Sequence, residues 1–229
     1  MGARLASTSG DDLALAYRRL NAAYAQTLRY AEDVRHLYQR TQRAICQSLL
    51  GLANALEAKD PYTRGHSERV GAWSRQLAGA LGLASGDVET IAQAGLLHDI
   101  GKIGVPESIL GKRGPLDADE WTAMRRHPVI GAQIVAPFEF LDGASLTIRH
   151  HHERYDGSGY PDGLGGEAIP LGARIVAVAD VYDALTSDRP YRAALSRQEA
   201  IGLLVAEAGH TFDGCLVAAF VRLQDRVGA

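Results

Sequence analysis

A regular hydrophobic pattern marks the N-terminal part of the chain. Mostly apolar residues recur there at alternating intervals of four and three, with no Gly or Pro between Leu13 and Leu50. A 3.5-residue repeat sustained over several heptads is typical of a coiled coil. The same pattern also fits one long amphipathic helix packed on its own domain, and both interpretations stay open. The repeating positions are Leu13, Tyr17, Leu20, Tyr24, Thr27, Ala31, Val34, Tyr38, Thr41, Ile45, Ser48 and Leu52.

The pattern on either side of this helix sets the expected domain boundaries. Residues 1–10 are small and polar, which predicts a disordered tail before a helix over 11–51. After Pro61 the pattern predicts successive helices. Two of these begin with the spacing of a capping box, at 117–120 and 196–199.

Two later segments have a less regular pattern. A long glycine-rich loop is expected over 156–172, and loops of this length in compact domains are usually functional. The apolar segment 175–178 fits a short buried strand by propensity and a buried helix equally well.

Composition narrows the class of protein. The chain has 229 residues, enough for one ordinary domain and a small appendage, and its 46% hydrophobic content indicates a globular protein. Its two cysteines, Cys46 and Cys215, form no disulfide framework and fit a reducing, cytoplasmic location. A net charge of −3 argues against a duplex nucleic acid partner. No apolar run is long enough to predict a membrane span or a secretory signal.

Histidines and acids fall on faces that the pattern predicts to be buried. His98 lies seven residues after Ile91 and is followed directly by Asp99. Asp180 lies four residues after Val176, on an apolar face if that segment is helical. Burying an unpaired carboxylate is costly, whereas a metal ion neutralises carboxylates and binds imidazole lone pairs. Taken alone, each position also fits a hydrogen-bonded core residue or a helix cap, so spacing leaves the ligand set open.

Five motifs in order make the chemistry more specific. They are KDPYTRGHS over 59–67, HDIGK over 98–102, MRRHPVIG over 124–131, HHERYDGSGYP over 151–161 and DVYDALTSDRPYR over 180–192. Together they resemble the HD-GYP domain, from about Leu52 to Phe220. The resemblance implies an all-α fold, with an HD-type helical bundle as the catalytic domain over 52–229. The helix over 11–51 would then serve signalling and dimerisation.

The resemblance also implies an activity in bacterial signalling. Members hydrolyse cyclic di-GMP to linear pGpG, and in some cases further to GMP. They use a binuclear metal centre, usually of iron or manganese, whose bridging hydroxide attacks phosphorus in line. By motif, the metal ligands here are His66, His98, Asp99, His127, His151, His152 and Asp180.

Three positions near the expected centre define the bridging ligand, a histidine outside the set and the number of ions. Asp99 is the ligand expected to bridge the two ions. His150 is left outside the set as an outward neighbour. Some members of the family have a Glu where this chain has Tyr62 and hold a third metal ion, so two ions are expected here.

Other residues are candidates for substrate contact. Lys102 lies one turn after Asp99 and is the first candidate for a phosphate contact, so we expect both to act in catalysis. Arg189 and Arg192 are three residues apart and could bind phosphate oxygens bidentately, or pair with nearby acids such as Asp183 and Asp188.

Two residues of the fourth motif, Tyr160 and Glu153, have less certain roles. Tyr160 either contacts the substrate or only packs the glycine-rich loop. Glu153 is expected to orient a ligand imidazole from outside the metal shell, and not to act as a base.

Two other functions stay open. One is hydrolysis of another cyclic dinucleotide by the same superfamily, and the Gly-Tyr-Pro loop argues against it. The other is a non-catalytic nucleotide-sensing scaffold, and the complete set of ligand positions argues against that. The expected partner is a second copy of the chain, bound through the N-terminal helix. The sequence contains no recognisable sensor or receiver domain, so two alternatives stay open: a separate sensor or regulator protein supplies the signal, or the enzyme is constitutively active.

Overall fold

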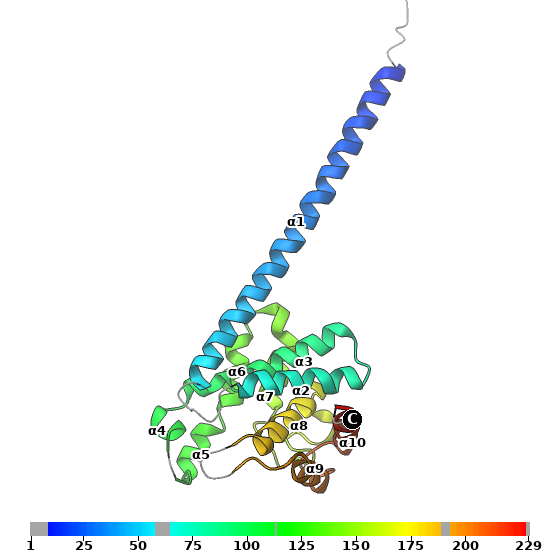
Figure 1. Ribbon diagram of the computed structural model, residues 1–229. Helices are drawn as coiled ribbons and strands as arrows, with labels where there is room; N and C mark the ends of the chain where they lie inside the picture. The colour runs from blue at the N-terminus through cyan, green and yellow to red at the C-terminus, as the bar shows by residue number, and fades with distance from the viewer. Residues whose placement is uncertain (1–8, 58–64, 113, 189–192, 228–229) are drawn as a thin grey trace, which may run out of the picture. The chain divides into compact units, whose positions relative to one another are not determined.

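The chain folds entirely as helices in the part that the structure describes. The computed structural model describes residues 9–57, 65–112, 114–188 and 193–227. Its regular elements within these ranges are all helical, and the bridge between Ala208 and Phe212 is isolated, so the predicted all-α class is confirmed (Figure 1). None of the described helices combines the length and apolarity that crossing a membrane requires.

The N-terminal pattern forms one continuous helix. Helix α1 spans Ser9–Glu57, so it begins inside the expected tail and ends beyond residue 51, while residues 1–8 lie outside the described ranges. The chain divides into two compact units within this helix, Met1–Gln47 and Ser48–Ala229. In the first unit, apolar residues of the repeat are exposed in the single chain, Leu13 at 72% and Val34 at 64%.

The second unit is a series of shorter helices. They are α2 (His66–Ala80), α3 (Ser85–Leu97), η1 (Ile100–Gly104), α4 (Glu107–Leu110), α5 (Ala118–Met124), α6 (His127–Val135), η2 (Glu139–Leu141), α7 (Asp142–His150), η3 (Gly166–Ala168), α8 (Leu171–Thr186), α9 (Arg197–Ala206) and α10 (Gly214–Val227). Both predicted capping boxes are present, at the starts of α5 and α9. The ambiguous segment 175–178 lies inside α8, so its helical interpretation is the correct one.

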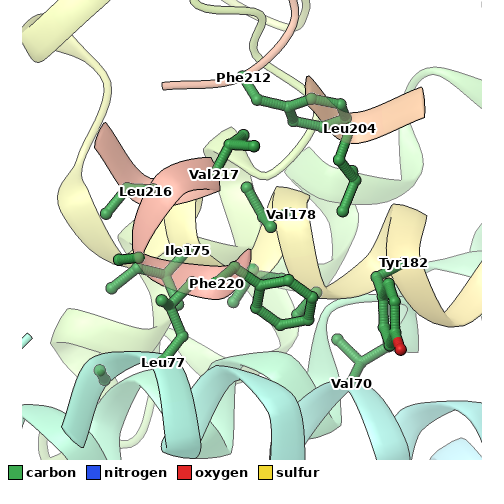
Figure 2. Packing of buried hydrophobic residues seen from close by; sticks show 14 of the residues in the cluster. Val70, Leu77, Ile175, Val178, Tyr182, Leu204, Phe212, Leu216, Val217 and Phe220 are labelled. Atoms are coloured by element: carbon green, nitrogen blue, oxygen red, sulfur yellow. The ribbon is translucent and has the colours of Figure 1, made fainter. Parts of the chain in front are cut away.

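The hydrophobic core surrounds α8, which packs against α2, α3, α7, α9 and α10. Figure 2 shows side chains from these helices converging, among them Leu77 of α2, Val178 of α8 and Phe220 of α10. The Tyr182 ring contacts the Phe220 ring at 4.8 Å between centroids. Burial of so many apolar groups fixes α8, the helix that carries Asp180.

Close backbone contacts place the ends of several helices next to one another. Helices α2 and α3 cross closely at Gly71 and Gly95. A Cβ added to Gly95 would lie only 3.0 Å from the Gly71 Cα. This crossing brings the start of α2 beside the end of α3, and the His66 and His98 rings are 5.2 Å apart. Gly101 of η1 lies even closer to α6, because a Cβ there would be 1.9 Å from the His127 carbonyl oxygen.

Candidate metal centre

The seven expected ligands come from five separate helices but lie in one cluster. Most of them stand at helix ends: His66 and His127 begin α2 and α6, and the others flank α3 and α7 or lie within α8. The histidines expected as ligands at 66, 98, 127 and 151 are buried, and the Asp99 and Asp180 side chains are only 18% and 17% exposed. A polar cluster enclosed to this degree needs partners for its charges.

The nitrogen and oxygen atoms that could bind metal form two adjacent groups, each from three residues. One group contains His127, His151 and His152, and the other contains His66, His98 and Asp180, with the atoms of each group within 4.8 Å of one another. A third group, formed by His98, Asp99 and His151, joins the two. Asp99 Oδ1 lies 3.3 Å from His127 Nε2, and Asp99 Oδ2 lies 3.5 Å from His98 Nε2. The Asp99 carboxylate therefore faces a histidine of each group.

Three of the histidines are oriented with a free lone pair toward this cluster. The Nδ1 atoms of His98, His127 and His151 lie 2.7, 2.8 and 2.7 Å from the carbonyl oxygen three residues earlier. A carbonyl oxygen only accepts, so Nδ1 carries the hydrogen and Nε2 keeps its lone pair. Each of these Nε2 atoms is buried and has no hydrogen-bond partner in the described structure. Buried polar atoms are rarely left unpaired, and bound metal ions would satisfy all three.

His66 is held by carboxylates instead of a carbonyl. Its Nδ1 lies 2.8 Å from Asp183 Oδ2, and its Nε2 lies 3.3 Å from Asp180 Oδ1. Burial lowers the pKa of His66, but hydrogen bonds to the two carboxylates outweigh burial and raise it to about 10. Arg69 also donates to Asp183, with Nε 2.6 Å from Oδ1. The sequence indicates Asp183 only as a possible partner for the arginines of the last motif, and its contact with His66 is a finding of the structure.

The start of α2 is fixed by a second acid. Glu57, the last residue of α1, accepts the backbone N–H of Gly65 at 2.8 Å and that of Ser67 at 2.7 Å. Gly65 adopts a φ of 70°, a left-handed conformation that favours glycine. These contacts define how the chain enters α2 and therefore where the His66 ring lies.

Electrostatics favours the ligand forms of three histidines and of Asp99. Burial lowers the pKa of His127, His151 and His152, that of His152 to about 4, so these imidazoles are neutral near pH 7. Burial raises the pKa of Asp99, but the nearby charge of Lys102 is the strongest opposing influence, and the pKa is held well below its usual range. Lys102 forms an ion pair with Asp99 Oδ2. Neutral imidazoles beside ionised carboxylates are the donor set that divalent metal ions bind.

The glycine-rich loop is anchored beside the cluster. The two Glu153 oxygens accept the backbone N–H groups of Asp162, at 2.7 Å, and Leu164, at 3.1 Å. Glu153 therefore binds the backbone of the loop, and not a ligand imidazole as expected from the sequence. Backbone carbonyls take its expected place beside His98, His127 and His151. The ring nitrogen beside Glu153 is His150 Nδ1, at 3.6 Å. Tyr160 in this loop lies with its ring centroid 4.9 Å from that of His152.

Three expected residues cannot be placed. Arg189, Arg192 and Tyr62 fall outside the described residues. The acids considered as partners for the two arginines have other described contacts. Asp183 binds Arg69 and His66, and Asp188 Oδ1 accepts the backbone N–H of Ala194 at 2.8 Å.

Comparison with known protein families identifies the family of this chain. The model of the HD domain matches residues 51–216. The chain belongs to the HD domain family. The resemblance to the HD-GYP domain is also confirmed by curated relatives.

Two of these relatives differ in the substrate that their names give. The chain is 47% identical over 178 residues to the cyclic di-GMP phosphodiesterase response regulator RpfG of Xanthomonas campestris pv. campestris, covering 77% of this chain and 47% of the relative. It is 43% identical over 152 residues to the 3′3′-cGAMP-specific phosphodiesterase 3 of Vibrio cholerae, covering 65% of this chain and 32% of the relative. The chain therefore spans half or less of the length of these relatives.

A solved structure supports the same fold. A cyclic GMP-AMP specific phosphodiesterase of Vibrio cholerae superimposes with a TM-score of 0.63 at 19% identity, covering 79% of this chain and 48% of that one. At this level of identity, the likeness supports the helical architecture alone.

Proposed function

We propose that this chain is a metal-dependent phosphodiesterase that hydrolyses cyclic di-GMP to linear pGpG, with GMP as a further product. The observation that carries the proposal is the pair of ligand groups joined through Asp99, with three buried Nε2 lone pairs turned toward them. The identity of 47% to a relative named as a cyclic di-GMP phosphodiesterase supports the choice of substrate.

The proposed centre holds two divalent ions, of iron or manganese. Its ligands are His66, His98, Asp99, His127, His151, His152 and Asp180. Bound at this position, the ions would activate water and offset negative charge on the phosphoryl oxygens. A mixed set of imidazoles and carboxylates suits both metals.

The chain's own groups have distinct tasks in this proposal. The backbone carbonyls behind His98, His127 and His151 keep each ring turned with Nε2 toward the centre. Asp99 contributes one oxygen to each ligand group. Lys102, paired with Asp99, keeps a positive charge where the substrate phosphate would approach. We assign the remaining phosphate contacts to Arg189 and Arg192, which lie outside the described residues.

The N-terminal helix is proposed to pair with a second copy of this chain. Its heptad repeat runs along α1, and Leu13, Tyr24 and Val34 of the repeat are each more than half exposed in the single chain. A second copy carrying the same repeat would cover this seam. Pairing of this kind would also provide a route by which a regulator acts on the catalytic domain.

The activity is tested on the purified chain loaded with Mn²⁺, or with Fe²⁺ under anaerobic conditions. Wild-type protein should convert cyclic di-GMP to pGpG, followed by chromatography, and Asp99→Asn should lower the rate at least about 100-fold. His210→Gln is the matched control, because His210 is an exposed histidine outside the cluster and should keep full activity. If wild type and Asp99→Asn both bind cyclic di-GMP but neither hydrolyses it, the result would instead support the non-catalytic nucleotide-sensing scaffold.

A second substrate is favoured by one specific observation. The 43% identical relative from Vibrio cholerae is named for 3′3′-cGAMP. The two substrates are separated by measuring kcat/KM for each on the same enzyme preparation. A higher kcat/KM for 3′3′-cGAMP would make it the preferred substrate and overturn the assignment to cyclic di-GMP.

A further inference from the structure

A run of stacked side chains leads outward from the candidate metal centre. The His152 and Tyr160 rings are 4.9 Å apart between centroids and inclined by 31°. The Arg125 guanidinium carbon lies 5.3 Å from the Tyr160 ring centroid and 5.9 Å from that of Trp121. The run therefore connects a proposed ligand, through the glycine-rich loop, to the surface of α5.

The outer end of this run is open to solvent. Trp121 is 48% exposed, although a large indole is usually more deeply buried. Trp121 and Arg125 are four residues apart at the end of α5, so their side chains share one helical face. An exposed indole next to an exposed guanidinium offers a flat face and hydrogen-bond donors together.

Most arginines of this unit that the structure describes pair with a carboxylate, and Arg125 does not. Arg69 pairs with Asp183 and Arg174 with Asp213, whereas Arg126 and Arg222 are like Arg125 in having no ion pair among the described residues. Among the described residues Arg125 has no ion pair, and its recorded side-chain contacts are the two aromatic rings. Its N–H donors therefore stay available to a ligand.

We propose that Trp121 and Arg125 form a subsite for a guanine base of the substrate. The inference rests on the proposed function, because it supposes that a phosphodiester is bound at the metal centre. A nucleotide base is joined to its phosphate through one ribose, so the base extends beyond the centre toward the surface. The run from His152 to Trp121 extends along such a path.

The chemistry of the two side chains selects the base. The indole of Trp121 provides a face on which any base can stack, which is a sequence-tolerant contribution. An arginine fork donates two hydrogen bonds to O6 and N7 of guanine, whereas adenine presents an amino donor in place of O6. The subsite thus accepts a dinucleotide that contains guanine and disfavours cyclic di-AMP.

The test compares substrates with and without a purine. Arg125→Ala and Trp121→Ala should each lower kcat/KM for cyclic di-GMP by about 5- to 100-fold, mainly by raising KM, as expected for the loss of one base contact. Hydrolysis of bis(p-nitrophenyl) phosphate, a diester without a purine, should stay unchanged. Trp121→Phe should retain most of the activity because it keeps a stacking face, and Arg222→Ala, an exposed arginine of α10, is the matched control.

Base preference gives a second readout. The Arg125→Ala variant should lose the wild-type preference for cyclic di-GMP over cyclic di-AMP. An unchanged KM for cyclic di-GMP, or an equal loss on both diesters, would overturn the subsite.

The subsite and the proposed function can fail separately. A wild-type protein that hydrolyses neither diester would contradict the proposed function. The subsite is then decided by calorimetric binding of cyclic di-GMP, which Arg125→Ala should weaken to the same extent. Equal affinity of wild type and Arg125→Ala would contradict the subsite.

Discussion

The His66 ring is bound on its outer edge by Asp183, whose Oδ2 lies 2.8 Å from Nδ1. The same carboxylate accepts from Arg69, which donates through Nε at 2.6 Å and Nη2 at 3.0 Å. Asp183 is 2% exposed, so this contact between α2 and α8 is shielded from solvent. A carboxylate behind a ligand imidazole fixes the ring and increases its basicity.

Asp183→Asn should weaken metal binding while the fold is retained. The amide keeps the shape of the side chain but removes the charge that holds His66 and Arg69. We expect Mn²⁺ affinity to fall about 10- to 100-fold, measured by competition with a chelating dye. Asp87→Asn, an exposed acid at the start of α3, should leave the affinity unchanged. Equal affinities for Asp183→Asn and wild type would show that the contact does not position His66 for metal.

Gly101→Ala should destabilise the catalytic unit. A Cβ at this position would lie 1.9 Å from the His127 carbonyl oxygen and 2.4 Å from the Gly131 nitrogen, both backbone atoms that cannot move aside. We expect the free energy of unfolding in urea to fall by about 2–3 kcal/mol. Gly79→Ala is the matched control, because no atom beyond the adjacent residues and backbone of its own helix lies within 4 Å of its Cβ position in α2. That variant should be as stable as wild type or more stable by up to about 1 kcal/mol. A similar stability change in both variants would mean that η1 is not closely packed on α6.

The metal-free protein should lose stability as the pH falls from about 6.5 to about 4. Burial lowers the pKa of His152 from 6.5 to about 4 and also lowers the pKa values of His127 and His151. Below pH 6.5 the unfolded chain therefore binds protons that the folded chain does not. Each such histidine reduces the free energy of unfolding by up to about 1.4 kcal/mol per pH unit. His66, whose pKa is raised to about 10, is protonated in both states here and does not offset the loss.

Urea denaturation in the presence of EDTA, repeated over this pH range, measures the slope. Replacing His152 by Gln removes one titrating group and should make the dependence shallower. A stability that stays constant or increases toward pH 4 would contradict the burial of neutral imidazoles.

Leu20→Lys should convert the chain from dimer to monomer. Leu20 lies on the heptad seam and is 66% exposed in the single chain, so pairing would place two lysines in one interface. Light scattering should give about twice 24.5 kDa for wild type and a single chain mass for the variant. Leu15→Lys, on the same helix but outside the seam, should keep the wild-type mass. A monomeric wild type would refute pairing through α1.

Local signals were sufficient for much of the fold. The capping boxes at 117–120 and 196–199 predicted two helix starts because a cap depends on residues only three apart. The segment 175–178 could not be assigned in this way. Five other helices enclose α8, so this segment is apolar on all sides. A short run that is apolar on all sides has no periodicity that distinguishes a buried helix from a buried strand.

The site was predictable to the extent that its motifs were specific. The expected ligands lie together in space, yet their roles came from the resemblance and not from spacing. Contacts between distant segments gave no local signal: His66 and Asp183 are 117 positions apart, and Glu153 reaches loop nitrogens that only the folded backbone brings near. The run from His152 to Trp121 likewise depends on how α5 and the loop pack, which spacing along the chain does not reveal.

The central claim is that side chains from five helices together hold two metal ions. The most direct test is the metal content of anaerobically purified protein, measured by mass spectrometry after saturation with Fe²⁺ or Mn²⁺ and removal of the excess. The account predicts about two ions per wild-type chain and fewer than one in Asp99→Ala, since Asp99 faces both ligand groups. A wild-type chain that retains one ion or none, or an Asp99→Ala chain that still holds two, would contradict it.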